Sequence, residues 1–177
     1  LIQYRSEHES MVERVAERTM QTPWGEFRAV AYRDLASGAP HLALAHGAIT
    51  PDTETLVRVH EPATMLDVLS ADATAHSWTV SSALKAISAA PTGLLVLLNC
   101  QGTADLLFEQ FAAWKQPSEQ PPSGGESRFD LRTYGIGAQI MRDLNVGRAR
   151  LLARPRKMPS MTGFSLTITG YDSEPSS

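Results

Sequence analysis

The sequence predicts an α/β fold in which a layered mixed sheet is flanked by helices. Short segments with alternating or apolar patterns, at 27–32, 41–45 and 56–59, indicate strands. A helical pattern runs from Ser77 to Ala90, and the continuous apolar run Leu94–Leu98 that follows is typical of a strand covered on both faces. Strands and helices therefore alternate along the chain, which favours a layered α/β domain.

The first regular pattern covers residues 4–18 and predicts an amphipathic helix. Charged residues fill most of this stretch, and its apolar positions recur at helical spacing. A turn is expected at Thr22–Gly25, before the first predicted strand, and Ser37-Gly38 and Pro51-Asp52 indicate the turns that separate the strands. The residues on the shared face of the predicted helix are Tyr4, His8, Met11, Val12 and Val15.

The helix predicted over 77–90 has Ser77 as its expected N-cap and an apolar face of Val80, Leu84 and Ile87. Pro91 and Gly93 are the residues expected to end it.

The second half of the chain contains less regular patterns. Asp105 is expected to cap a helix over 106–115, and the Pro- and Gly-rich stretch Pro117–Gly125 predicts a mobile loop. An alternating strand is expected at 163–169, and residues 172–177 are expected to be disordered. The predicted organisation is a helical linker at 1–20, one domain at 21–170 and a disordered tail at 171–177.

Composition sets the broad class of the protein. The chain has 177 residues, 42% of them hydrophobic and 20% charged, which suits a single globular domain with a real core. The net charge of −3 gives no basic footprint for nucleic acid, and the longest apolar run, Gly93–Leu98, is far too short to cross a bilayer. The single cysteine, Cys100, excludes an internal disulfide and suits a reducing compartment, so we expect a cytoplasmic protein without nucleic-acid or membrane partners. Because the chain begins at Leu1 within a helical pattern, we expect it to be a fragment of a longer protein.

The stretch DLRTYGIGAQIMRDLNVGRARLLARPRK, residues 130–157, predicts a loop, a helix opened by Gly135 and Gly137, a buried strand and a basic end. Its helix has an apolar face and ends near Asn145 and Gly147. Free N–H groups at a helix start attract anions, so the stretch is a candidate phosphate or carboxylate site. Glycines also serve tight packing, and basic residues after a strand are often solvated, so a purely structural role stays open. The residues of the candidate anion site are Asp130, Arg132, Gly135, Arg156 and Lys157.

The same stretch resembles the C-terminal part of GTP cyclohydrolase II, an enzyme that opens GTP in riboflavin biosynthesis. TPWGEFRAVAYRD, residues 22–34, and the segment from HLALAHGAI to LVRVHE, between Pro40 and Glu61, are similar to that family too. The resemblance covers about Val15 to Gly170, and it implies a GTP cyclohydrolase II-like layered fold and a homodimer.

Members of the family that this chain resembles hold a zinc ion with three cysteines. These cysteines follow an Arg-Val-His stretch, which is Arg58 to His60 in this chain. The corresponding positions are occupied by Ala63, Thr74 and His76, of which only His76 could bind a metal. We therefore expect no cofactor and no zinc.

The substrate-binding positions of the family have changed as well. Its Arg-Gln-Glu-Gly-Arg pattern is replaced by Asn99 to Thr103, and a chemically active tyrosine by Trp114. Charge-assisted contacts to base and phosphate are thereby lost, while Asp130, Arg132 and Lys157 match family residues. Cys100 is expected to be a buried apolar residue and not a nucleophile.

These losses lead to the expectation of a catalytically inactive GTP cyclohydrolase II-like domain, not itself an enzyme. LIQYRSEHESMVERVAE resembles the junction of fused riboflavin proteins, which implies an upstream dihydroxybutanone phosphate synthase domain as partner. The domain would then be an accessory, regulatory or oligomerising module in riboflavin biosynthesis. The alternative is a sensor that binds a nucleotide, a flavin or a phosphate at the Gly-rich helix start.

Overall fold

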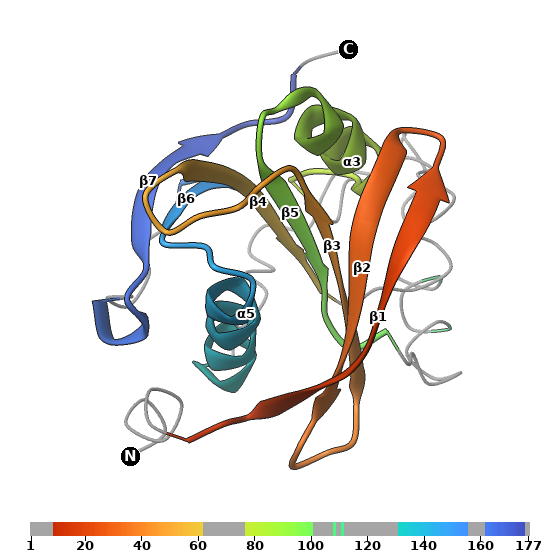
Figure 1. The fold of residues 1–177 in the computed structure, drawn as a ribbon, viewed down its shortest axis with the longest axis vertical. Helices are drawn as coiled ribbons and strands as arrows, with labels where there is room; N and C mark the ends of the chain where they lie inside the picture. The colour runs from red at the N-terminus through yellow and green to blue at the C-terminus, as the bar shows by residue number, and fades with distance from the viewer. Residues whose placement is uncertain are drawn as a thin grey trace.

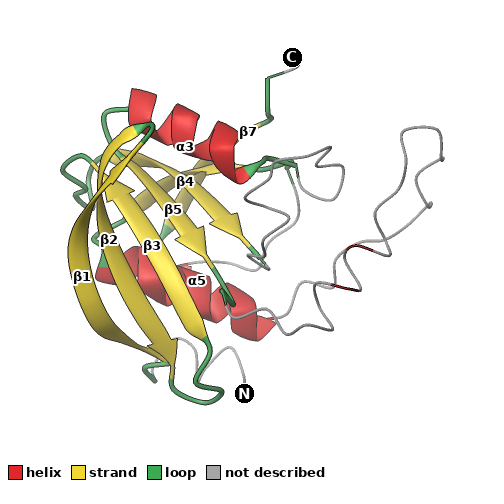
Figure 2. Cartoon of the chain, turned by 90° about the vertical axis from the view of Figure 1, so that its right-hand side faces the viewer, coloured by secondary structure: helices red, strands yellow, loops and turns green. Residues whose placement is uncertain are grey.

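The structure, a computed structural model, describes residues 9–61, 77–100, 108, 111, 131–155 and 162–175. Its described core is one seven-stranded mixed sheet in the strand order β1-β2-β3-β5-β4-β6-β7. A helix lies on each face of the sheet (Figures 1 and 2). The expected α/β fold with a layered mixed sheet is thus confirmed. The strands are β1 (Val12–Thr22), β2 (Gly25–Asp34), β3 (Pro40–His46), β4 (Glu54–His60), β5 (Gly93–Leu97), β6 (Arg148–Leu152) and β7 (Thr167–Asp172), and the helices are α3 (Val80–Ala89), α5 (Leu131–Asp143) and the short 3-10 helix η1 (Thr162–Phe164).

The sheet changes from antiparallel to parallel at β5. Strands β1, β2 and β3 form an antiparallel meander, and β3 pairs antiparallel with β5. Strand β5 pairs parallel with β4, which pairs parallel with β6, and β6 pairs parallel with β7. The carboxyl ends of β4 and β5 therefore meet at one edge, which we call the carboxyl edge.

Each helix covers a separate hydrophobic core. Under α5, Ile140 and Leu144 pack against sheet residues such as Val57 and Val96, and all four are fully buried. Under α3, Ile87 and Leu84 pack with Leu95 and neighbouring side chains. Burial of large aliphatic side chains stabilises by about 1.5–3 kcal/mol each, so the two helices hold the sheet from both sides.

The helix ends follow local sequence signals. Thr79, not the expected Ser77, is the N-cap of α3, and its side chain accepts a hydrogen bond from the Ser82 N–H at 3.1 Å. Helix α5 is stopped by Asn145, which lies two residues beyond the last residue of the helix and has a positive φ of 66°. The N–H of Val146 donates to the carbonyl of Met141 and that of Asn145 to Arg142, which is the Schellman pattern. The expected stop signal at Asn145 is confirmed.

The expected helix over 4–18 is wrong for its described part, because Val12–Thr22 forms strand β1. A tight turn at Pro23-Trp24 lets this segment pair antiparallel with β2 along its whole length. Of the apolar residues that suggested a buried helical face, Val15 is 50% exposed, whereas Met11 and Val12 are partly buried against the core under α5. Residues 12–20 therefore belong to the sheet and not to a helical linker.

The last predicted strand is displaced towards the C-terminus. Strand β7 begins at Thr167 and reaches Asp172, while η1 occupies the start of the expected strand. Asp172 belongs to the ordered sheet and not to a disordered tail, because its carbonyl accepts the indole N–H of Trp78 at 2.8 Å and its carboxylate binds Arg150. The expected helix over 106–115 and the loop over 117–125 lie outside the described residues, apart from Phe108 and Phe111.

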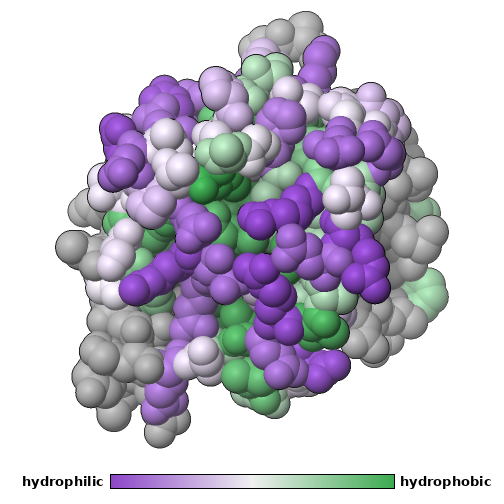
Figure 3. Space-filling view, in the orientation of Figure 1, coloured by the Kyte–Doolittle hydropathy of each residue, from purple (hydrophilic) through white to green (hydrophobic). Residues whose placement is uncertain are grey.

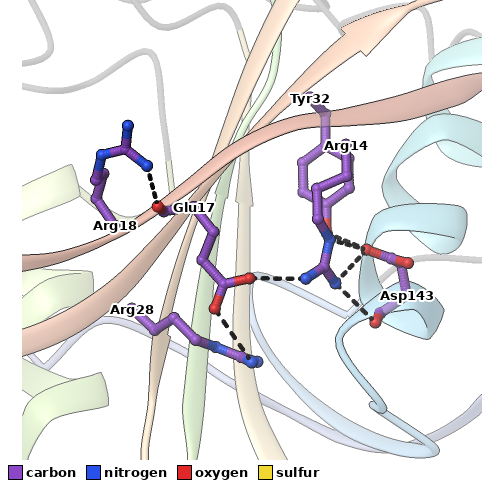
Figure 4. A network of polar contacts seen from close by, with 6 residues as sticks. All are labelled: Arg14, Glu17, Arg18, Arg28, Tyr32 and Asp143. Atoms are coloured by element: carbon purple, nitrogen blue, oxygen red, sulfur yellow. Dashed lines mark hydrogen bonds and ion pairs between the residues drawn. The ribbon is translucent and has the colours of Figure 1, made fainter.

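A polar network fastens β1 to α5 (Figure 4). Arg14 donates to the Asp143 carboxylate at 2.7 Å and to Glu17 at 2.8 Å, and Glu17 also lies 3.7 Å from Arg28. The buried Tyr32 hydroxyl donates to the same Asp143 oxygen at 2.5 Å. The edge strand β1 is thus held to α5 through polar side chains. The face of the molecule seen in Figure 3 is largely hydrophilic, with hydrophobic residues between the hydrophilic ones.

Candidate functional site

The carboxyl edge of β4 and β5 is the place where polar side chains from several elements meet. Ligand sites of parallel sheets form outside the carboxyl ends of the strands. Glu61 follows β4 directly, and the Asn99 side-chain amide donates to its carboxylate. Asn99 has a positive φ of 53°, which turns the chain sharply after β5.

The turn after β5 is bonded to the start of β3. The N–H of Asn99 donates to Nδ1 of His41 at 3.0 Å, and the N–H of Cys100 donates to the Pro40 carbonyl at 3.0 Å. Because Nδ1 accepts, a neutral His41 ring carries its hydrogen on Nε2. His41 is 2% exposed, and its Nε2 has no hydrogen-bond partner within the described part of the chain. Burial lowers the pKa of His41. The negative charge of Asp34 raises this pKa, and the positive charge of Arg132 lowers it further.

Arg132 and Asp34 form the strongest ion pair of the edge. The two guanidinium nitrogens of Arg132 each lie 2.5 Å from one carboxylate oxygen of Asp34. Oδ1 of Asp34 also accepts the N–H groups of Ala36 at 2.8 Å and Ser37 at 3.2 Å. The Arg132 guanidinium holds the pKa of the buried Asp34 carboxyl well below its usual range, against burial and together with those N–H groups.

The candidate anion site at the α5 start is only partly described. Helix α5 already includes Leu131, so Gly135 and Gly137 lie inside it, and the prediction that they open the helix is wrong. Only the first four N–H groups of a helix lack intrahelical partners and are free to bind an anion. Gly135 is the fifth residue of α5, so its N–H is not one of them. A Cβ on Gly137 would lie 3.8 Å from a side-chain carbon of Val59, which is an ordinary van der Waals contact, so the packing of α5 on the sheet does not require a glycine here. Asp130, Arg156 and Lys157 lie outside the described residues, so the site itself stays a prediction.

Sequence reasoning missed the partner of Arg132. Asp34 lies 98 residues away in the chain, at the end of β2, and no local pattern links the two. The β2–β3 hairpin also brings His41 near Asp34, although the sequence offered no carboxylate motif around this histidine. The available signal was the hairpin itself, with its turn at Ser37-Gly38 between two alternating strands.

Arg58 and His60, which match the Arg-Val-His stretch, lie inside the fold. Arg58 is 6% exposed and donates to the Leu152 carbonyl at 2.9 Å and the Trp78 carbonyl at 3.3 Å. Nη2 of Arg58, the nitrogen that donates to Trp78, also lies 3.4 Å from Nδ1 of His60. Arg58 therefore ties β4 to β6 and to the segment that leads into α3.

Metal binding can be judged only in part. The described residues contain no group of three or more His, Cys, Asp or Glu side chains placed to hold a metal ion. Ala63, Thr74 and His76 lie outside them, and of these only His76 has a ligating side chain. The residues at the family's zinc positions do not fit the ion, and the absence of zinc stays a prediction. Cys100 is half-buried and not fully buried as expected, and this burial raises the pKa of its thiol.

None of the described helices is long and apolar enough to span a membrane. The cytoplasmic location expected from the sequence stays a prediction.

Comparison with known proteins gives relatives over nearly the whole chain. The chain is 39% identical over 174 residues to a 3,4-dihydroxy-2-butanone 4-phosphate synthase of Neisseria meningitidis serogroup A, covering 97% of this chain and 45% of the relative. It is 35% identical to a protein of the same name from Pseudomonas aeruginosa, covering 97% and 46%. It is 33% identical to the riboflavin biosynthesis protein RibBA of Cytophaga hutchinsonii, covering 96% and 43%. The chain thus spans less than half the length of these relatives.

A solved structure is similar as well. RibBX from A. baumannii, described as a two domain 3,4-dihydroxy-2-butanone 4-phosphate synthase, matches with a TM-score of 0.63 and 25% identity. The match covers 99% of this chain and 44% of that one.

These relatives correct two expectations. The chain was expected to be a catalytically inactive module and not an enzyme, but relatives at 39% and 35% identity over 97% of the chain are named for an enzyme. The residues found missing belong to zinc-assisted opening of GTP, and their loss bears on that reaction alone. Neither the relatives nor the structure shows a loss of activity. An inactive role, whether accessory or as a sensor, is therefore withdrawn.

The family itself is settled by the match along the chain. The family model for GTP cyclohydrolase II covers residues 13–173, from β1 to just beyond β7. The segments that resembled this family, at 22–34 and 130–157, both lie within that range. The chain belongs to the GTP cyclohydrolase II family.

Proposed function

We propose that this chain is part of a 3,4-dihydroxy-2-butanone 4-phosphate synthase and serves riboflavin biosynthesis. The observation that carries the proposal is the 39% identity to the N. meningitidis synthase over 97% of the chain. The proteins of this name from P. aeruginosa and Photobacterium phosphoreum support it, at 35% and 34% identity.

The carboxyl edge is the part of the chain best suited to a role in that protein. It gathers a carboxylate, an amide and a buried imidazole from three separate strands or their exits: Glu61, Asn99 and His41. Arg132 adds a guanidinium fixed by Asp34 at the start of α5. Side chains held in this way by hydrogen bonds lose little entropy when they act on a ligand or a neighbouring domain.

The test uses the longer protein that contains these residues. Formation of 3,4-dihydroxy-2-butanone 4-phosphate from ribulose phosphate is measured for the whole protein and for a version that lacks this chain. We expect the whole protein to form the product and the shortened version to form it more slowly. No product from the whole protein, or an unchanged rate after the deletion, would contradict the proposal.

A matched pair of variants locates the contribution within the chain. Asn99→Ala removes the amide at the carboxyl edge, while Gln21→Ala removes an amide that binds Glu26 on the exposed β1–β2 hairpin. We expect the first to lower the rate and the second to leave it unchanged. A homodimer, an upstream synthase domain and a small phosphate or nucleotide ligand all remain predictions.

A further inference from the structure

His41 is a buried titratable side chain at the junction of three elements. It opens β3 after Pro40, pairs with Tyr32 across β2, and accepts the N–H of Asn99 after β5. Along β3 it lies on the same face as Ala43 and Ala45, two and four residues on, which belong to the core under α5. Its ring therefore lies on the α5 side of the sheet.

The charged groups that act on His41 are Asp34, at the end of β2, and Arg132, in the first turn of α5. Other titratable groups on the surrounding elements include Tyr32 on β2, Tyr134 on α5, Cys100 after β5 and Glu61 after β4, while Asp143 is the last residue of α5. Tyr32 donates to Asp143, and Cys100 lies against the Leu97 carbonyl. Among the described residues, Asp34 is the carboxylate whose charge acts on His41, while Glu61 accepts the side-chain amide of Asn99.

Asp34 is already fully engaged. Each of its oxygens binds a nitrogen of Arg132, and Oδ1 accepts two backbone N–H groups as well. A second cation beside it would have to share this carboxylate with Arg132. Buried charges that lack a full partner are costly, so the sharing would weaken the hold on Arg132.

We propose that His41 is an acid-sensitive latch that fastens the first turn of α5 and the turn after β5 to the carboxyl edge. A proton from solvent binds the lone pair of Nδ1 and converts the ring to an imidazolium. Nδ1 can then no longer accept the Asn99 N–H, and that hydrogen bond breaks. The new positive charge competes with Arg132 for Asp34, and the first turn of α5 loosens.

The direction of the pH dependence follows from the buried position of His41. Burial lowers the pKa of His41 in the folded protein below the value of about 6.5 for an unfolded chain. The neutral ring therefore stabilises the closed latch fully above pH about 6.5, and this contribution is lost as the pH falls below that value. The latch is closed at neutral pH and opens in acid.

Amide hydrogen exchange in the full-length protein tests the latch. The N–H groups of residues 135–138 bond to carbonyls of the first turn of α5, so they report its opening. Amides 84–87 of α3 serve as the internal reference, because α3 lies on the other face of the sheet. Between pH 7.5 and pH 5.5, after correction for intrinsic exchange, we expect protection in α5 to fall relative to α3, by at most about tenfold if the ring titrates near pH 6.5 once the latch is open.

Two variants separate the latch from general acid instability. In His41→Asn, the amide oxygen replaces Nδ1 as acceptor and cannot take a proton, so the pH effect on α5 should disappear. His46→Asn, at the other end of β3 where the ring lies 5.7 Å from that of Phe27, should keep the wild-type effect. An effect that persists in His41→Asn, or a constant α5-to-α3 ratio in the wild type, would overturn the proposal.

Should His41→Asn fail to fold, the wild-type protein still decides by nuclear magnetic resonance. The ring signals of His41 should titrate at the same pH as the amide signal of Asn99 and the loss of protection in α5. Titration of the ring without a change in either would contradict the latch.

Discussion

Asp34 shows how much one side chain can hold together in this protein. It is 2% exposed, and it joins a hairpin turn to a helix through four hydrogen bonds. Its pKa lies well below the usual range because the ionised form binds Arg132. Stability gained in this way is fully present above the pKa of the unfolded carboxyl, about 3.9, and is lost as the pH falls below it.

Replacing Asp34 by Asn should therefore destabilise the protein in a pH-dependent manner. The amide oxygen can still accept the turn N–H groups, but the partly exposed Arg132 loses its counter-charge, which costs about 1.5–3 kcal/mol at pH 7. The difference from the wild type should shrink as the pH falls below about 4, because the Asp34 carboxyl of the unfolded wild-type chain then takes up a proton while the folded one stays ionised, which favours unfolding of the wild type. Urea unfolding at both pH values measures it. Asp52→Asn, in an exposed turn, is the control and should change little, and equal losses at both pH values would contradict the ion-pair explanation.

The Tyr32 hydroxyl gives a second residue-level prediction, in the network of Figure 4. Tyr32→Phe removes the hydrogen bond to Asp143 and should cost about 1 kcal/mol of unfolding free energy. A double-mutant cycle with Asp143→Asn should show coupling of at least about 0.5 kcal/mol, since the two groups touch. The same cycle with the distant Glu26→Gln should be additive. An additive cycle with Asp143→Asn would mean that this hydrogen bond contributes nothing.

The elements were predictable where local pattern and tertiary burial agree. Strands β2 to β6 and helix α3 follow sequence patterns that the fold also buries, and Asn145 ends α5 through its own backbone preference. Strand β1 was missed because nearly all of it is exposed, so its apolar residues follow no burial period. Its conformation comes from pairing with β2, a non-local effect that overrides helical propensity. The start of α5 was misjudged because Gly135 and Gly137 were taken as the sign of a helix start, whereas both lie inside the helix.

The two glycines that flank β3 allow a matched test of the fold at the scale of elements. Gly38 and Gly47 have positive φ values of 76° and 74°, so alanine at either position costs about 1–2 kcal/mol of backbone strain. A Cβ on Gly38 would meet nothing within 4 Å, whereas one on Gly47 would lie 2.1 Å from the Pro91 carbonyl oxygen. Gly47→Ala should therefore destabilise more than Gly38→Ala, since β3 and the α3–β5 turn would have to separate. Urea unfolding of both variants measures the difference, and equal losses would show that this close approach is absent.

At the scale of the whole molecule, the sheet sets the site by joining distant parts of the chain. Residues 34, 41, 99 and 132 meet because β3 lies between β2 and β5 while α5 crosses the same face. Family resemblance located Asp130 to Lys157 as a region of interest, yet it gave no reason to connect Arg132 with Asp34. A sequence motif indicates the chemistry of neighbouring residues in the chain. The partner of a charged side chain, by contrast, depends on the order of the strands in the sheet, which a single sequence does not give directly. For the same reason, missing motif residues bear on one reaction and leave the activity of the whole protein open.

Zinc content is the property of the whole molecule that those missing residues do predict. A protein zinc site needs about three or four ligands from thiolate, imidazole or carboxylate groups. Positions 63 and 74 hold alanine and threonine, so His76 alone would give only weak binding. The purified protein should contain well under about 0.5 zinc per chain, and a chelator should leave its thermal unfolding unchanged because no bound metal supports the fold. Elemental analysis of wild type and His76→Ala should give the same low value, whereas one zinc per chain, lost in His76→Ala, would reveal a site that His76 forms together with residues other than those at positions 63 and 74.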